Sequence, residues 1–163
     1  MNKIVCIILL LIISFLSVVS HAQPKDSLLV QLSRKWTNAK AYTLKMVDLM
    51  PAENFGFKPV AEEMSFKEQL LHIAKNMKWL SSVFLLNHGN NGAIDTATID
   101  KAALIKILTD AYDQALSAHH LNVKQLDEKV SFFAGPLTRR QILILMHDHQ
   151  THHVGQIIVY LRL

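Results

Sequence analysis

The chain has 163 residues, a length that corresponds to one domain, and it contains a single cysteine, Cys6. Its 17 lysine and arginine residues outnumber 13 aspartate and glutamate residues, which gives a formal net charge of +4. No dense basic stripe with interleaved aromatic residues occurs, which argues against nucleic-acid binding, and one cysteine excludes a Cys-rich zinc site or an internal disulfide.

Residues 1–22 have the pattern of a secretory signal peptide. Lys3 precedes an apolar run over residues 4–19, and small residues then lead to a cleavage position after Ala22. A retained membrane anchor is the alternative, but the run is shorter than the roughly 20 residues that a membrane-spanning helix needs. We therefore predict a periplasmic or secreted protein. Its mature domain, residues 23–163, has no cysteine, no membrane attachment, and 16 basic against 13 acidic residues, a net charge of +3.

The first helix of the mature chain is predicted from about Lys25 to Met50, and Pro51 ends it. Apolar side chains recur there every three or four residues, at Leu28, Leu29, Leu32, Trp36, Ala39, Tyr42, Met46 and Val47. The next stretch, residues 52–64, contains a glycine and a proline and is predicted to be a loop.

The second helix begins at a capping box, in which Ser65 and Glu68 satisfy each other's free backbone N–H groups. The glycine-containing segment 87–92 ends this helix. Its apolar stripe consists of Phe66, Leu70, Ile73, Met77, Leu80 and Phe84.

The third helix is predicted from the N-cap Asp100 to about His120, with an apolar stripe at Leu104, Ile107, Leu108, Ala111, Ala115 and Leu116. A connector follows over residues 121–137, which is long for a loop between bundle helices. The fourth helix begins at a second capping box, Thr138 with Gln141, and runs to the chain end. One face of it carries Ile142, Leu145, Met146, His149, His153, Gln156, Ile157 and Tyr160.

These four segments predict an all-α fold, because none shows sustained strand alternation. Helices of roughly 20 to 26 residues are about 30 to 39 Å long. Four helices of that length pack as a bundle, and ligand sites in bundles are built from side chains on facing helices.

Histidines are concentrated in the fourth helix. Residues four apart on a helix are offset by about 40°, so His149 and His153 form a pair of imidazoles that point the same way. His147 lies about 200° from His149 and is expected to face elsewhere, whereas His152 lies about 60° away and is a possible spare ligand or supporting group.

A third ligand has to come from another helix, and His72 is the best candidate because it lies among aliphatic residues and needs a polar partner. Hydrogen bonding of His72 to a core side chain or backbone group is the alternative. His88 is expected at a solvated helix end, and His119 and His120 at a helix C-terminus, where the helix dipole favours an imidazolium. These three are assigned to no site.

Three segments resemble the DinB-like superfamily of metal-binding four-helix bundles. Residues 65–74 look like that family's second helix with its single metal histidine, and residues 149–157 are similar to its H-x-x-x-H-x-G-Q signature on the fourth helix. Residues 50–59 look like its first loop. The resemblance extends from about residue 28 to the chain end. It implies a bundle with a long crossover connection and a divalent metal held by His72, His149 and His153.

The sequence departs from that pattern at Val154, where the family often has arginine. The neighbouring Gln156 and, on the second helix, Asn76 carry amides that either pack structurally or bond a ligand at the site. Glu68 and Asp148 are the nearest carboxylates, but the capping box already explains Glu68 and Asp148 is expected to point outward. The catalytic residues are therefore unknown.

Three neutral imidazoles leave a divalent ion its full charge and an open position, which suits hydrolysis or thiol-dependent transfer. Zn or Ni are the expected metals, with Fe, Mn or Cu also compatible with histidine ligands. No H-E-x-x-H or Glu-x-x-His set occurs, so a metalloprotease or di-iron oxidase is not supported.

Two functions remain open at this point. One is a metal-dependent hydrolase or transferase acting on a small molecule, with export favouring the hydrolase. The other is a non-catalytic helical bundle in which the metal is structural or serves ligand binding. An open coordination position beside a pocket would favour the enzyme, and a fourth ligand such as His152 would favour the structural role. Homodimerisation through exposed helix faces is compatible with either.

Overall fold

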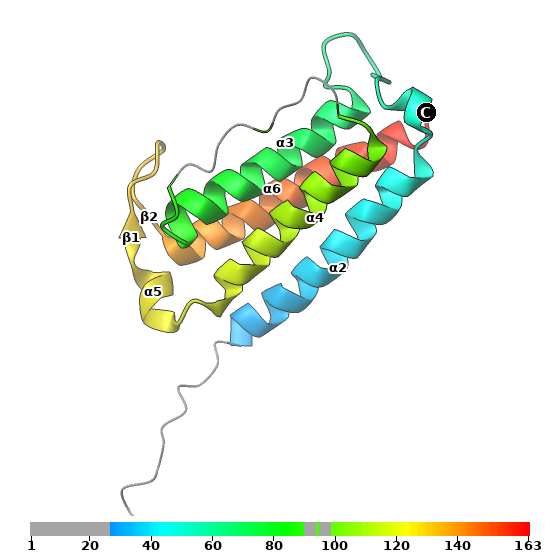
Figure 1. Ribbon diagram of the computed structural model, residues 1–163. Helices are drawn as coiled ribbons and strands as arrows, with labels where there is room; N and C mark the ends of the chain where they lie inside the picture. Colours follow the sequence, from blue (N-terminus) through cyan, green and yellow to red (C-terminus); the bar gives the residue numbers. More distant parts are fainter. Residues whose placement is uncertain (1–26, 90–93, 95–98) are drawn as a thin grey trace, which may run out of the picture.

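The computed structural model describes residues 27–89, 94 and 99–163, and its described part is predominantly helical, as predicted (Figure 1). Residues 1–22, the predicted signal peptide, and its cleavage position lie outside the described residues. Four long helices lie side by side: α2 (Ser27–Leu49), α3 (Phe66–Trp79), α4 (Lys101–Ser117) and α6 (Arg139–Tyr160).

Helix α3 packs against both α4 and α6, and α2 packs against α4 and α6. Figure 1 shows that α3 and α4 run in the same direction and that α2 and α6 run in the opposite one. The face of α3 that carries His72 therefore meets the antiparallel helix α6, which carries His149 and His153. This arrangement brings together two segments that are more than seventy residues apart in the sequence.

The predicted starts of the second, third and fourth helices are confirmed by the hydrogen bonds at their N-termini, whereas the predicted start of the first, near Lys25, lies outside the described residues. Both bonds of the capping box form between Ser65 and Glu68, and both form between Thr138 and Gln141. The side chain of Asp100 accepts a hydrogen bond from the backbone N–H of Ala103 at 2.7 Å. Each cap satisfies backbone donors that the first helical turn leaves free, so these side chains fix where α3, α4 and α6 begin.

The second predicted helix is not one continuous α-helix, which corrects the prediction. After Trp79 the chain winds into a π-helix, η2 (Leu80–Leu85), in which the backbone N–H of Leu86 donates to the carbonyl of Ser81 at 2.8 Å. The wider turn keeps Leu80, Phe84 and Leu85 buried. A π-turn inserts one extra residue, which apolar periodicity does not reveal.

The predicted loop over residues 121–137 also contains ordered elements. Helix α5 (Val123–Asp127) begins at a third capping box and buries Leu126. Two short antiparallel strands follow, β1 (Lys129–Val130) and β2 (Leu137–Thr138), with Lys129 opposite Thr138. Two further single turns are 3₁₀-helical, η1 (Ala52–Asn54) and η3 (Ala118–His120).

The core lies where the apolar stripes of the four long helices meet, and most predicted stripe residues are buried. Several others are half-buried, and two are exposed: Tyr42 is 54% exposed and Leu145 is 36% exposed. At the first of these positions the neighbouring Thr43 is buried instead, and its hydroxyl shares a 2.7 Å hydrogen bond with the hydroxyl of Tyr112. Within the described residues, no helix has the length and apolar character needed to cross a membrane.

Candidate metal centre

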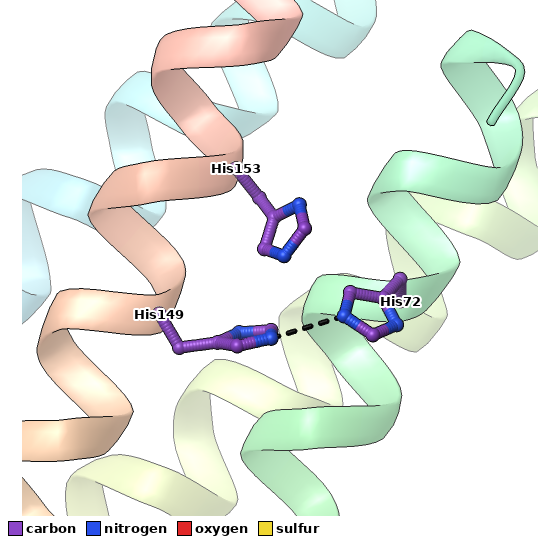
Figure 2. Close-up of side chains that lie close together, drawn as sticks. All are labelled: His72, His149 and His153. Carbon is purple, nitrogen blue, oxygen red and sulfur yellow. Dashed lines mark hydrogen bonds between the residues drawn. The ribbon is translucent and has the colours of Figure 1, made fainter. Parts of the chain in front are cut away.

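The rings of His72, His149 and His153 converge between α3 and α6 (Figure 2). Their centroids are 4.4 to 4.8 Å apart. The Nε2 atoms of His72 and His149 are 3.0 Å apart, and one ligand atom from each of the three residues lies within 4.8 Å of the others. The structure thus brings together the three histidines named from the sequence as metal ligands.

The local helices explain this convergence. His149 and His153 lie one turn apart on α6, so their side chains leave the helix on the same face. His72 lies in the second turn of α3, close to the capping box that fixes the start of that helix. Because both helices are anchored at their N-termini, the three rings are held by regular helical backbone rather than by loops.

A buried glutamine fixes the orientation of one ring. Gln69 is 1% exposed, and its Oε1 accepts a 2.7 Å hydrogen bond from Nδ1 of His153. The proton of His153 therefore resides on Nδ1, which leaves the lone pair of Nε2 available to a metal ion. This contact was not predicted. The only sequence signal is that Gln69 precedes His72 by three residues and so borders the same face of α3.

The same amide starts a chain of hydrogen bonds. Nε2 of Gln69 donates to Oε1 of Gln156 at 2.7 Å, and Nε2 of Gln156 donates to Nε2 of His152 at 2.9 Å. Both amide atoms of Gln156 are thus engaged by side chains. His152 is exposed and is not among the residues that can share an ion with the cluster. In this structure Nε2 of His152 accepts the hydrogen bond from Gln156.

Two buried polar atoms near the cluster have no partner among the described residues: Nδ1 of His149 and Oδ1 of Asn76. Nδ1 of His149 would carry the imidazole proton if Nε2 bound a metal. Oδ1 of Asn76 is a hydrogen-bond acceptor. Asn76 lies one turn after His72 on α3, so it flanks the cluster on the side opposite Gln69.

Burial keeps the three imidazoles neutral. It lowers the pKa of His149 and that of His153 to about 4, and the neighbouring histidines of the cluster contribute further. Burial and then the charge of Lys75 lower the pKa of His72. Metal ligation requires unprotonated imidazole nitrogen, so the cluster is in the correct form at neutral pH.

These residues fit a divalent transition metal. The 3.0 Å contact between Nε2 of His72 and Nε2 of His149 requires a shared proton when no ion is present. An ion about 2.0 to 2.1 Å from each nitrogen replaces that proton and separates the ligand atoms by roughly 3.4 Å in tetrahedral geometry. The pair already lies near this separation, and the ligand atoms of all three histidines lie within 4.8 Å of one another.

A cavity of about 450 Å³ opens beside the cluster, and His72 belongs to its wall. The other lining residues are Met64, Lys67, Glu68, Leu71 and Lys75. Glu68 Oε2 accepts the backbone N–H of Ser65 at 2.7 Å, and these contacts with Ser65 lower its pKa. All of these lining residues except Met64 belong to α3, so the cavity lies on the α3 side of the cluster.

Asp148 is exposed, as predicted. Val154, which stands where the resembling family often has arginine, is 6% exposed and belongs to the hydrophobic core. Neither residue contributes to the cluster of possible ligands among the described residues.

A second histidine pair lies outside the cluster. His147 faces away from His149, as predicted, and its Nε2 lies 3.1 Å from Nε2 of His119. The expectation that the helix dipole would favour an imidazolium at His119 is wrong, because this residue is only 5% exposed and burial lowers its pKa. The pair was missed because it depends on contact between two helices.

Comparison with known proteins shows where this fold has been seen. The family model described as the DinB family matches residues 22–163. The uncharacterized protein YjoA of Bacillus subtilis (strain 168) is 23% identical over 137 residues, which cover 81% of this chain and 88% of YjoA.

Two solved structures have similar folds. The crystal structure of YjoA, described as a DinB-like protein, superposes with a TM-score of 0.68 at 21% identity and covers 81% of this chain and 90% of its own. A DinB-like protein from Bacillus cereus superposes with a TM-score of 0.65 at 18% identity and covers 80% and 89%, respectively. At these identities the likeness establishes the fold alone.

Proposed function

This chain belongs to the DinB family, and from that premise and the geometry of the site we propose that it is an exported, metal-dependent enzyme acting on a small molecule. His72, His149 and His153 hold one divalent transition metal, with Zn or Ni expected before Fe, Mn or Cu. The reaction is hydrolysis or thiol-dependent transfer, and export favours hydrolysis. The proposal includes a leader of residues 1–22 and a DinB-like four-helix bundle with a long crossover over residues 23–163.

One observation favours an enzyme over a structural metal site: a cavity of about 450 Å³ has His72 in its wall. A structural site is closed by a fourth protein ligand, whereas a catalytic site keeps a position for its substrate. The residue that would have closed the site, His152, accepts a hydrogen bond from Gln156 instead. One member of the three-histidine set, His72, thus has an approach from solvent.

Each side chain has a specific part in this proposal. The neutral imidazoles of His149 and His153 donate lone pairs from the same face of α6, and His72 completes the set from α3. Gln69 holds the proton of His153 on Nδ1 and away from the site. A divalent ion bound there would act as a Lewis acid on a carbonyl or phosphoryl group or on a thiol.

The test is to express the full chain without a polyhistidine tag and to purify the exported product. Its intact mass reports whether cleavage occurs after Ala22. Its metal content is then measured by elemental mass spectrometry. A His149→Ala/His153→Ala variant removes two ligands, and a His88→Ala/His120→Ala variant serves as the matched control because both of these histidines are exposed.

We expect about one divalent ion per chain in the wild type and in the control, and loss of the ion from the His149→Ala/His153→Ala variant. Metal-loaded protein is then assayed with small ester, amide and thiol-transfer substrates. Absence of bound metal from the wild type, even after dialysis against Zn or Ni, contradicts the proposal. An intact mass that includes residues 1–22 contradicts its export component alone.

A further inference from the structure

The cavity beside the cluster has an unbalanced positive charge. Lys67 and Lys75 both line it, and neither ammonium has a carboxylate partner among the residues that the structure describes. Lys40 and Lys106 differ in this respect, since they pair with Asp113 and Asp110. The wall of the cavity therefore contributes two cations that no described acidic side chain neutralises.

Glu68 is the one carboxylate in the wall, and its charge is already matched. Its Oε2 accepts the backbone N–H of Ser65 at 2.7 Å and lies 3.7 Å from Nζ of Lys58. Counting Lys58 and Glu68 as a neutral pair leaves the charges of Lys67 and Lys75. A ligand in the cavity thus experiences an attractive potential for negative charge.

The two lysines flank His72 along α3. They are eight residues apart, about 12 Å along the helix axis, and His72 lies between them. Lys75 is close enough for its charge to act with burial in lowering the pKa of His72. Both lysines line the same cavity as His72, so an anionic group that they hold in this cavity lies next to the cluster.

Two apolar side chains also line the cavity: Leu71, which is 3% exposed, and Met64, which is 37% exposed. A cavity lined by apolar side chains and two cations fits an organic molecule with a short carbon skeleton and an acidic head group.

We propose that this cavity binds a small organic anion, with a carboxylate or phosphate group held by Lys67 and Lys75 and the adjoining bond directed to the ion held by His72, His149 and His153. This inference names the substrate class of the proposed enzyme and rests on that function. The two lysines are binding and positioning groups, and the head group they hold is not the group that reacts.

The test uses the exported protein in metal-free and Zn-loaded form. Succinate and inorganic phosphate are titrated separately as probes of the two head groups, and succinamide serves as the neutral analogue of succinate. Binding is followed by amide chemical shifts in NMR spectra. The variant Lys67→Gln/Lys75→Gln removes both charges while keeping most of each side chain, and Lys45→Gln is the control because Lys45 is exposed on α2 and does not line this cavity.

We expect succinate or phosphate to shift the resonances of residues 64–75 and succinamide to leave them unchanged. The affinity of the better probe should fall roughly tenfold in Lys67→Gln/Lys75→Gln, as expected for the loss of two partly exposed ion pairs, and stay unchanged in Lys45→Gln. The stronger of the two probes assigns the head group as carboxylate or phosphate.

Equal affinity of the double variant and the wild type for both probes overturns the inference, as does binding of succinamide with the strength of succinate. The titration of metal-free protein keeps this result separate from the metal-dependent function. If the wild type holds no metal, the proposed function fails, and the lysine dependence of anion binding still decides the charge of the ligand. The double variant is expected to retain its metal, because neither lysine is a ligand.

Discussion

Gln69 shows how one neutral side chain controls the chemistry of the histidine cluster. Its carbonyl oxygen accepts the Nδ1 proton of His153, and its amide nitrogen donates to Gln156 at 2.7 Å and to the hydroxyl of Tyr160 at 3.4 Å. Both ends of the amide are thus occupied, so the group cannot turn over without losing hydrogen bonds. The tautomer of His153 is therefore set by a residue that does not itself bind a metal.

Replacing Gln69 with leucine should weaken metal binding roughly 10- to 100-fold, the usual loss when a partner that orients a metal-ligating histidine is removed. His153 then loses the acceptor that keeps its proton on Nδ1, so its Nε2 is unprotonated for a smaller fraction of the time. Competition with a chromophoric chelator measures the change in affinity, and the ¹⁵N shifts of the imidazole report the tautomer.

The matched control is Gln150→Leu. Gln150 is also a buried glutamine, 3% exposed, but it bonds Tyr112 and Thr151 rather than a histidine of the cluster. Both variants lose buried hydrogen bonds, so both should be destabilised. If Gln150→Leu lowers metal affinity as much as Gln69→Leu does, the effect is general loss of stability and Gln69 has no specific role.

Among individual residues, the sequence predicts positions that depend on the geometry of one helix. It misses contacts that form between two helices. His149 and His153 are recognisable from their spacing, because a helical turn places them on one face. His72 was the best candidate among the other histidines because it lies among aliphatic residues, and the family resemblance strengthened that choice. The contact between Gln69 and His153 depends on how α3 and α6 are aligned and on the rotamers of both residues, so no local pattern shows it.

At the scale of elements, the second histidine pair joins the end of α4 to α6. Nδ1 of His119 donates to the carbonyls of Ala115 and Leu116, at 3.2 and 3.3 Å, so its Nε2 must accept the proton of Nε2 of His147. The ring of Trp36, from α2, packs on His147 with centroids 4.5 Å apart. Three elements therefore meet at a pair of neutral imidazoles.

The pair should make the metal-free protein sensitive to acid. Burial, followed by the charges of His119 and Lys35, lowers the pKa of His147 to about 3, whereas its ordinary value is 6.5. Between these values the unfolded chain binds more protons than the folded one, so the free energy of unfolding decreases as the pH falls below about 6.5. The decrease is about 1.4 kcal/mol per pH unit for each such proton. Urea denaturation at a series of pH values between 7 and 4 measures this slope.

The double variant His119→Leu/His147→Leu removes both partners together and leaves neither unpaired. It should show a shallower pH dependence than the wild type over the same range, although the histidine cluster still contributes to the slope of both proteins. Identical slopes would mean that the pair is protonated in the folded protein without cost, and the account of its burial would be wrong.

Helices and strands also differ in how far they can be predicted, because local contacts show in the sequence and contacts between distant segments do not. The starts of α3, α4 and α6 were predicted to the residue, because an N-cap is a contact between residues three apart. The π-helix after Trp79 and the strands β1 and β2 were not predicted. Arg139 shows why: its guanidinium donates to the carbonyl of Leu85 at 2.6 Å and lies 3.3 Å from the carboxylate of Glu128. These contacts stabilise the end of the π-helix and the hairpin from a distant part of the chain.

At the scale of the whole molecule, the proposed metal links α3 to α6 across the helical packing. The two helices already share a hydrophobic interface, with Leu70, Ile73 and Met77 of α3 and Ile142, Met146 and Ile157 of α6 fully buried. We therefore expect the protein to fold without the ion, in contrast to small metal-dependent domains. The proposed ion would add a cross-link between helices that the core already holds together.

Removing the metal should lower thermal stability without unfolding the protein at room temperature. An ion that binds only the folded state, at a free concentration 100 times its dissociation constant, adds about 2.7 kcal/mol. For a domain of this size, that corresponds to a decrease in Tm of roughly 5 to 10 °C on chelation. Calorimetry of Zn-loaded protein with and without excess chelator measures this change in Tm.

A His72→Ala variant should retain the helical circular dichroism spectrum and lose the response to chelator. That combination separates an ion that ties α3 to α6 from one that binds α6 alone, because a site made only of His149 and His153 would leave the response to chelator intact when His72 is removed.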